Sequence, residues 1–512
     1  MNRQVAFKNV EWGKDDAKGD NRLMNYFVKL PEYNDIESGA KRYIIGRKGT
    51  GKTAVAQHIK LRSRQDPLIF ARSLSLRNFP LQDLRSLRDR GLRDKAQFVP
   101  IWKFLLATEF ARLAAEDQGV MNYSVLAPLN EFLNTNFGKN SFSFNETVKT
   151  LRDNNSKVAV KNSFISREVS KGTESESIVH LHYERITTYL VDLLKQIHTD
   201  STYFIFLDEL DEGYAAGDKN LRLTLLALLR AVEDISQELS EDNQAFRAVA
   251  LLRSDIFDRL EDNDLNKLDD FVVRLEWTGS AGARHSLQEV VNERIKASIE
   301  LPDSGSPWDF ITINKSRSYP EVVKTLWNFM YNRTFDRPRD ILKFLKVCQQ
   351  VGQIERLKLF EVEDAEPSYS DWFHNELRDE MQSHFAAWRP AVQCLRKIGR
   401  GVFEYQLLLD ALRSDSTINQ WVETSGRDFE SAARYLFDFS VIGNLSNNGN
   451  WLFKYKDHDL EFNSSQKIIV HYGFQRKLKI GKRFTRGGVS RSSRTSSDGR
   501  IAERRRRRRE NS

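Results

Sequence analysis

Residues 41–53 read KRYIIGRKGTGKT, and this stretch decides how the rest of the chain is interpreted. Tyr43, Ile44 and Ile45 favour a β-strand, and the residues that follow match the phosphate-loop pattern G-x-x-x-x-G-K-T. After the loop, residues 54–60 space their apolar side chains as a helix does. Because the pattern requires a strand before it and a helix after it, this context predicts a nucleotide-binding loop rather than an ordinary glycine-rich turn.

Each position of this loop has an expected role. The glycines allow backbone N–H groups to turn toward a phosphate, and the start of the helix adds a partial positive charge. Lys52 is expected to reach the β- and γ-phosphates, and the Thr53 hydroxyl is expected to bind Mg²⁺. The predicted nucleotide-binding residues are Gly46, Arg47, Lys48, Gly49, Thr50, Gly51, Lys52, Thr53 and Ala54.

A second pattern supplies two carboxylates. The apolar run 203–207 is followed by Asp208 and Glu209. We expect Asp208 to hold Mg²⁺ through water and Glu209 to orient and deprotonate the attacking water. Strand ends are often acidic, so this run alone means little; together with the loop it predicts hydrolysis as well as binding. Asp211 and Glu212 either support these acids or belong to a solvated turn.

Arg253 is the first candidate for sensing the γ-phosphate. It directly follows the apolar run 247–252, and in a five-stranded phosphate-loop sheet a neighbouring strand ends near that phosphate. Ser254 is the second choice at this place. The alternative is a structural ion pair of Arg253 with Asp255 or Asp258.

Arg339 is the second arginine candidate. It follows Pro338 at an expected helix start, where the fixed φ of proline would aim the arginine reproducibly toward the phosphates. The alternative is an exposed arginine that caps an acidic turn with Asp336 or Asp340. Arg294 and Arg337 are weaker candidates.

The apolar runs predict an α/β fold, namely a parallel sheet of about five strands with helices on both faces. The predicted strands are 42–45, 68–72, 203–207, 247–252 and 271–277, and residues 219–235 have the apolar stripe of a sheet-covering helix. Helical stretches at 97–116 and 177–198 fall in a long interval that we interpret as an insertion.

The predicted organisation has five parts: an N-terminal segment 1–40, a nucleotide-binding core 41–280 with an insertion at about 75–200, a helical lid 281–387, a winged-helix-like domain 388–480 and an Arg-rich tail 481–512 that cannot form a core. In the first segment, Phe27 or Tyr33 could stack on adenine, although packing in the core is the favoured alternative. In the lid, Ser286 has the pattern of a helix cap and Pro320 is expected to open the helix 320–332.

The winged-helix prediction rests on helices near 389–398, 403–413 and 428–439 and on strands 451–455 and 467–471, with turns at 444–450 between them. A further helix near 369–387 is expected to connect the lid to it. The third helix of the set carries three acids and one internal base, Arg434, which disfavours its insertion into a DNA groove.

Net charge is +8, but it is unevenly distributed. From Arg476 to the end there are 15 Lys/Arg and 3 Asp/Glu, a balance of +12, so the rest of the chain carries −4. Any nucleic-acid binding inferred from basicity therefore belongs to the tail, which contains the run Arg504 to Arg509. The alternative interpretation is that the tail is a solubilising extension. The chain has two cysteines, and neither lies in a metal-binding pattern, which is typical of a protein from the reducing cytoplasm. We find no long apolar or signal-like segment, so the sequence predicts a cytoplasmic protein without membrane contact.

The run 44–54, with Tyr26-Phe27 and Tyr33 before it, resembles a family of bacterial phosphate-loop ATPases whose cellular role is mostly unassigned. The acid pair, the segment 252–255, the segment 337–340 and the winged helix resemble the STAND and origin-recognition-like branches of AAA+ ATPases. This resemblance implies the strand order 5-1-4-3-2, a helical lid, and an ATP state that switches a conformation or an assembly. By class alone it implies regulation of a partner or a bacterial defence or stress system. The predicted insertion at about 75–200 is a departure from the compact members of these ATPase families.

The sequence therefore predicts a Mg²⁺-dependent ATPase that acts as a switch, with ATP and Mg²⁺ as cofactors and a protein effector or self-assembly as partner. Catalysis is assigned to Glu209, Lys52 and Arg253, and the metal to Thr53 and Asp208. One alternative is a DNA-loading or DNA-remodelling ATPase that uses the winged helix and the tail. Another is a nucleotide-gated scaffold with little turnover. A kinase is disfavoured because no second substrate pocket can be pointed to.

Overall fold

The computed structural model describes residues 7–76, 84, 94–137, 144–153, 177–210, 218–240, 245–260, 265–279, 283, 285–302, 305–313 and 325–480. The chain divides into two compact units. The first consists of Met1–Thr312, Thr334–Leu357 and Arg378–His384, and the second of Ile313–Arg333, Lys358–Leu377 and Phe385–Ser512. The predicted lid, 281–387, contributes to both units.

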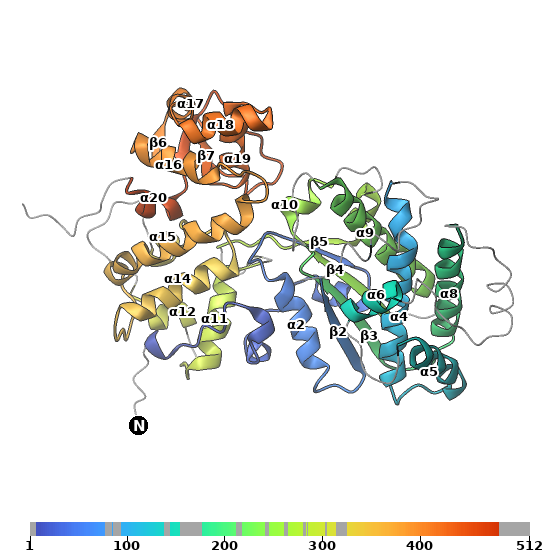
Figure 1. The fold of residues 1–512 in the computed structure, drawn as a ribbon. Helices are drawn as coiled ribbons and strands as arrows, with labels where there is room; N and C mark the ends of the chain where they lie inside the picture. Colours follow the sequence, from blue (N-terminus) through green and yellow to red (C-terminus); the bar gives the residue numbers. More distant parts are fainter. Residues whose placement is uncertain are drawn as a thin grey trace, which may run out of the picture. The chain divides into compact units, whose positions relative to one another are not determined.

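A five-stranded parallel sheet forms the centre of the first unit (Figure 1). Its strands are β1 (Tyr43–Ile45), β2 (Ile69–Ser75), β3 (Thr202–Asp208), β4 (Phe246–Leu252) and β5 (Val272–Arg274), in the order β2-β3-β4-β1-β5. Every neighbouring pair is parallel, which confirms the predicted mixed α/β fold with a parallel sheet. Read from the other edge, the order is 5-1-4-3-2, as the resemblance implies.

The two outer strands differ most from their predicted bounds. β2 continues to Ser75, beyond the predicted 68–72, and pairs with β3 as far as Asp208. β5 ends at Arg274 instead of 277, because the chain then leaves the sheet and the indole of Trp277 donates a hydrogen bond to the Thr50 carbonyl at 2.8 Å.

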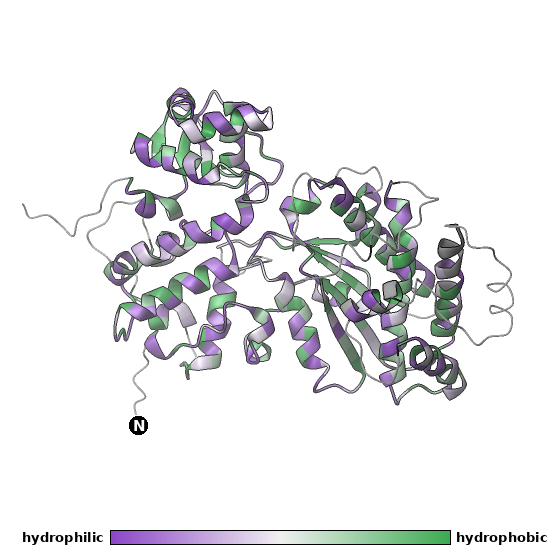
Figure 2. Cartoon of the chain, in the orientation of Figure 1, coloured by the Kyte–Doolittle hydropathy of each residue, from purple (hydrophilic) through white to green (hydrophobic). Residues whose placement is uncertain are grey.

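Alternating side chains of the strands build one core on each face of the sheet. Tyr203, Ile205 and Leu207 share a buried cluster with α4 (Val99–Glu116), α8 (Ser177–Lys195) and α9 (Lys219–Ser240). Phe204 and Phe206 face the other way, into a cluster with α1 (Tyr33–Ser38) and α2 (Lys52–Arg62). Figure 2 shows the strands as largely hydrophobic and the helices as two-sided. Helices therefore cover both faces, as predicted.

Part of the segment 75–200 is built into this core. The indole of Trp102 on α4 is buried and donates a hydrogen bond to the Thr224 carbonyl on α9 at 3.1 Å. The same segment contains η4 (Asp94–Phe98), α5 (Tyr123–Phe137) and α6 (Phe144–Asp153). α4 is thus a structural layer of the sheet domain.

The remaining described elements of the first unit are short helices at its start and a helical group after the sheet. They are η1 (Phe7–Asn9), η2 (Ala17–Gly19), η3 (Leu23–Asn25), α10 (Ser254–Phe257), η5 (Leu265–Phe271), α11 (Leu287–Ser298), α12 (Pro307–Ile311) and α14 (Pro338–Val351). The Ser286 hydroxyl caps α11 by accepting from the Glu289 amide, and Pro338 begins α14, as predicted.

The second unit combines helices with a small antiparallel sheet. The helices are α13 (Leu326–Tyr331), α16 (Trp388–Ile398), α17 (Tyr405–Arg413), α18 (Ser416–Ser425), α19 (Phe429–Asp438) and α20 (Tyr472–Leu478), together with most of α15 (Leu359–Met381). The strands are β6 (Val402–Phe403), β7 (Ile442–Leu445), β8 (Trp451–Leu452) and β9 (Lys467–Val470), in the order β6-β9-β7-β8. The winged-helix assignment stays a prediction.

Several predictions for this unit need correction. α18, β6 and β7 were not predicted, and β8 is shorter than 451–455. β7 reaches Leu445, because the buried Asn444 side chain donates to the Asn463 carbonyl and the turn starts only at Ser446. α15 begins ten residues before the predicted 369, with Pro367 inside it, and ends at Met381. The predicted opening at Pro320 lies outside the described residues.

Among the described helices, none is long and apolar enough to cross a membrane.

Candidate functional site

The predicted phosphate-binding residues form a loop between β1 and α2, and we refer to residues 46–51 as the glycine loop. Gly49 and Gly51 have φ values of 87° and 99°, a region that glycine adopts without strain. The loop is held from outside by the Trp277 indole on the Thr50 carbonyl, and from inside by the Thr50 hydroxyl, which donates to the Arg47 carbonyl at 2.9 Å. The loop conformation is thus fixed by its own chain.

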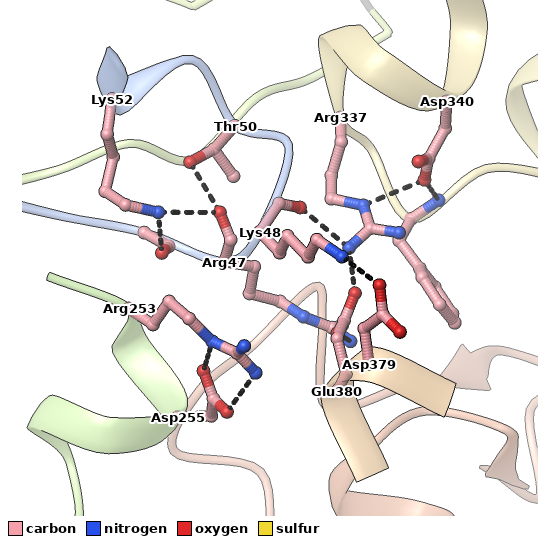
Figure 3. A network of polar contacts seen from close by, with 12 residues as sticks. Arg47, Lys48, Thr50, Lys52, Arg253, Asp255, Arg337, Asp340, Asp379 and Glu380 are labelled. Carbon is pink, nitrogen blue, oxygen red and sulfur yellow. Dashed lines mark hydrogen bonds and ion pairs between the residues drawn. The ribbon is translucent and has the colours of Figure 1, made fainter. Parts of the chain in front are cut away.

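Lys52, the first residue of α2, turns back over the glycine loop (Figure 3). Its ammonium donates to the Gly46 carbonyl at 2.7 Å and to the Arg47 carbonyl at 3.1 Å. The ammonium therefore lies beside the loop, at the start of a helix, where an anion would gain from both its charge and the helix dipole.

Thr53 connects the glycine loop to the predicted acid pair. Its hydroxyl lies 3.4 Å from Oδ1 of Asp208, at the end of β3. The two residues are separated by 155 positions in the chain, and the sheet brings them together because β1 and β3 end at the same edge. A hydroxyl and a carboxylate at this separation are oxygen ligands of the kind that Mg²⁺ prefers.

The acid pair itself has an unusual backbone. Asp208 is buried, and Glu209 has φ 59°, in the left-handed region that a residue with a Cβ rarely adopts. The Glu209 amide donates to Asp208 Oδ1 at 2.8 Å, and the Ser75 hydroxyl donates to the Glu209 carboxylate. Asp211 and Glu212 lie outside the described residues.

A cation from the start of the chain also contacts the acid pair. Lys18 Nζ lies 2.9 Å from Oε2 of Glu209 and 3.4 Å from Oδ2 of Asp208. Burial alone would lower the pKa of Lys18, but its contacts with these carboxylates outweigh that effect and raise the pKa. Lys18 is therefore charged at neutral pH.

Beside the loop is a cavity of about 130 Å³. Its lining includes five cationic and three acidic side chains: Lys14, Lys52, Arg294, Arg339 and Lys346, with Asp15, Asp16 and Asp20. This excess of positive charge fits a polyanion such as a phosphate chain. The volume is below the roughly 300 Å³ at which pockets for whole ligands begin, so a complete nucleotide would require part of the wall to move.

The structure separates the two arginine candidates. Arg339 lines the cavity, and its backbone amide donates to the Gly49 carbonyl at 3.3 Å. Arg253 instead makes two hydrogen bonds to Asp255, at 2.9 and 2.7 Å, and so forms the structural ion pair that is the alternative to phosphate sensing (Figure 3). Of the weaker candidates, Arg294 lines the cavity, whereas Arg337 lies in a buried ion-pair network.

That network joins the glycine loop to the end of α15, and we call it the Glu380 clasp (Figure 3). Glu380 accepts from Arg337 Nη1 at 2.5 Å and from Arg47 Nη2 at 2.9 Å, and Arg337 also donates to the Lys48 carbonyl at 2.8 Å. Burial raises the pKa of Glu380, but the charges of Arg337, Arg47 and Arg253 outweigh it and lower the pKa to about 2. Glu380 is therefore ionised at neutral pH.

The aromatic residues proposed for adenine are engaged by their own chain. Tyr33 is buried and its hydroxyl lies 2.6 Å from Nδ1 of His58, and the ring of Phe27 stacks on the same imidazole with centroids 4.1 Å apart. Burial, together with the charges of Arg62 and Lys29, lowers the pKa of His58 to about 4. This geometry favours the packing alternative for both aromatic residues.

Sequence reasoning missed Lys18, Ser75 and Glu380. Ser75 was detectable in principle, since it ends the strand next to β3 and is in register with Asp208. Lys18 and Glu380 belong to no motif, and their contacts are made by chain segments far from the loop in sequence.

Fold and site together define a mixed α/β protein in which a lysine-bearing glycine loop and a pair of carboxylates meet at one edge of a parallel sheet. Residues 285–378 match the model of the FunZ-associated C-terminal helical domain. The chain is also 22% identical over 360 residues to a putative transposon gamma-delta 80.3 kDa protein of Escherichia coli strain K12. That match covers 67% of this chain and 47% of the relative, so the chain spans about half the length of the curated relative it matches.

Proposed function

We propose that this protein is a Mg²⁺-dependent ATP-binding and ATP-hydrolysing switch. The observation that carries the proposal is the 3.4 Å separation between the Thr53 hydroxyl and Asp208, which unites the glycine loop with the acid pair. The acidic strand end alone is a weak signal. Its convergence with the phosphate-loop pattern falls at the carboxyl edge of a parallel sheet, which is where such sheets bind ligands.

In this proposal Lys52 and the glycine-loop amides bind the phosphate chain. Thr53 and Asp208 would hold Mg²⁺, which when bound withdraws charge from the phosphates. Glu209 accepts the proton of the attacking water, and its hydrogen bond from Ser75 fixes the direction of the carboxylate. Arg339 lines the same cavity and would add a further cation from α14. For Arg253 a sensing role would require it to leave Asp255.

The test compares Lys52→Ala and Glu209→Gln with the unaltered protein. Retention of radiolabelled ATP on a filter and release of inorganic phosphate are measured separately. We expect Lys52→Ala to lose retention, because the loop loses its cation. We expect Glu209→Gln to keep retention and lose phosphate release by at least 100-fold, which is the size of a general-base contribution. Full turnover by Glu209→Gln would remove its assigned role, and unaltered protein that ignores ATP would remove the proposal.

The switch part of the proposal rests on the Glu380 clasp. Arg47 and Lys48 belong to the loop that would wrap the phosphates, and both also bind carboxylates at the end of α15, Glu380 and Asp379. Residues 378–384 belong to the first unit, while the chain before and after them belongs to the second. A change in loop conformation on ATP binding or hydrolysis would therefore reach the chain segments that enter the second unit. In this proposal the output of the switch is the binding of a partner protein or the assembly of several copies of this chain.

A second candidate is an ATPase that acts on DNA, and the resemblance to a protein named for a transposon favours it. α19 argues against direct readout by that helix, because its N-cap Asp428 and its first-turn Glu430 are acidic. DNA binding that is stimulated by ATP and survives removal of residues 481–512 would support this candidate. Binding that disappears with the tail would assign it to the Arg-rich run alone.

A further inference from the structure

The segment that carries Lys18 is built to hold it in place. We call residues 12–20 the N-terminal strap. The Asp16 carboxylate caps the short helix η2 by accepting from the Lys18 amide at 3.0 Å. Asp20 accepts from the Lys14 amide at 3.2 Å and from the Tyr26 hydroxyl at 2.5 Å, and so closes the loop of the strap. These bonds fix the backbone from which the lysine extends.

The strap is also tied to the far wall of the cavity. Asp15 binds two lysines of α14, Lys343 at 3.3 Å and Lys346. Four strap residues between 14 and 17 line the 130 Å³ cavity beside the glycine loop. The strap therefore forms one wall of the space that a nucleotide would enter, and its lysine reaches the two carboxylates predicted to handle the metal and the water.

An ammonium and Mg²⁺ compete for the negative charge of the same carboxylate: Lys18 contacts Oδ2 of Asp208, and the Thr53 hydroxyl faces Oδ1 of that group. Lys18 lies within 3.4 Å of both acids, and a hydrated magnesium ion at Thr53 and Asp208 would place a second positive charge against it. The cation must therefore move as the metal enters. Because it sits on the strap, its movement would also open the small cavity.

We propose that Lys18 is a positioning residue whose ammonium supplies the positive charge beside Asp208 and Glu209 in the nucleotide-free protein, so that Mg²⁺ binding at Thr53 and Asp208 displaces the N-terminal strap. The inference rests on the proposed function for the identity of Thr53 and Asp208 as the metal site. It adds that the resting site is already neutralised by a lysine of the same chain, which keeps the buried Asp208 and the partly exposed Glu209 together without a metal.

The test measures Mn²⁺ binding by electron paramagnetic resonance with no nucleotide present. Lys18→Met is expected to bind Mn²⁺ about tenfold more tightly than the unaltered protein, since the metal no longer displaces two ion pairs. Lys18→Arg keeps the charge and is expected to stay near the unaltered affinity. Lys14→Met, with the same loss of charge on the same strap, serves as the matched control and is expected to change Mn²⁺ affinity less than threefold.

A double variant shows where the tighter binding arises. Asp208→Asn combined with Lys18→Met is expected to abolish the tighter binding. Equal Mn²⁺ affinity of Lys18→Met and the unaltered protein would overturn the proposal, and so would an equal gain in Lys14→Met. Since these measurements use no ATP, they separate the role of Lys18 from the proposed function, which falls instead if the unaltered protein neither retains nor hydrolyses ATP.

Hydrogen exchange gives a readout that a merely structural lysine would not move. In the unaltered protein, saturating Mg²⁺ with ATP is expected to speed exchange at residues 12–26 by at least fivefold as the strap is released. Unchanged or slower exchange there would contradict displacement.

Discussion

Replacement of Glu380 by Gln tests the clasp at its centre. Glu380 is 3% exposed and accepts from both Arg337 and Arg47. The pKa of its carboxyl falls from 4.5 to about 2 in the folded protein, which corresponds to roughly 3 kcal/mol of stability. Removal of one member of a buried ion pair costs a similar amount, about 3–5 kcal/mol, because the remaining charge stays buried. We therefore expect Glu380→Gln to destabilise the first unit by about 3 kcal/mol.

The neighbouring residue offers a matched control. Asp379 also binds a loop cation, Lys48, at 2.7 Å, but its side chain is 43% exposed. Exposed ion pairs contribute about 0–1 kcal/mol, so Asp379→Asn is expected to cost less than about 1 kcal/mol. The pair of variants thus changes the same charge, on the same turn of the same helix, and differs mainly in burial.

The assay must report on the first unit alone, because a chain with two compact units is not expected to unfold in one step. Amide hydrogen exchange followed by mass spectrometry at β3 and β4 gives the free energy of opening of the sheet. We expect this value to fall by about 3 kcal/mol in Glu380→Gln and by under about 1 kcal/mol in Asp379→Asn. Equal losses in the two variants would refute the claim that burial of Glu380 stabilises the clasp.

The pH dependence follows from the same pKa. A carboxyl whose pKa is lowered by folding stabilises the protein above its unfolded pKa of 4.5, and this contribution is lost as pH falls toward about 2. The difference in opening free energy between the unaltered protein and Glu380→Gln should therefore be constant from pH 8 to about pH 5 and shrink below it. A difference that persists unchanged at pH 3 would point to lost packing instead of lost charge.

Three further predictions concern the core and the loop. Trp102→Ala should destabilise the sheet by about 3–5 kcal/mol in the same exchange assay, since the indole is 1% exposed. The pKa of the buried His58 imidazole is about 4 in the folded protein and 6.5 when unfolded, so the unaltered protein loses stability as pH falls from 6.5 toward 4. His58→Phe should reduce this pH-dependent loss, which thermal melts between pH 7 and pH 4 measure. Gly49→Ala should weaken ATP retention at least tenfold, because φ is 87° and a Cβ would lie 3.0 Å from Cβ of Arg339. Gly51→Ala is the control: its Cβ would meet nothing within 4 Å, so it reports only the effect of the positive φ on ATP retention.

Much of the fold was predictable because its signals are local. The apolar run 203–207 and the loop 46–53 each carry their pattern within a few residues, so the parallel sheet followed from the sequence. β5 was overextended because 275–277 still contain apolar residues, whereas the Trp277 indole leaves the sheet to bind the glycine loop. The start of α15 was missed since Pro367 reads as a helix break.

The site was predictable only where a motif names its residues. Asp208 follows a strand pattern, but the contact between Arg47 and Glu380 joins residues 333 positions apart, and nothing in either segment points to the other. Lys18 lies in a polar stretch whose charges look solvated. Such pairings depend on which segments the fold brings together, and local periodicity holds no information on that.

The contacts around α14 suggest why these unpredicted residues belong together. The N-terminus of α14 binds the glycine loop through the Arg339 amide and the Glu380 clasp through Arg337, and its later lysines hold the strap through Asp15. A ligand that drew the loop amides inward would pull on the first two contacts, while a metal at the acid pair would push on the strap. Both movements are opposed by the same helix, so ATP and Mg²⁺ should each bind more tightly when the other is present. A thermodynamic cycle of ATP retention with and without Mn²⁺ measures this coupling, and Asp15→Asn, which frees the strap from α14, should reduce it.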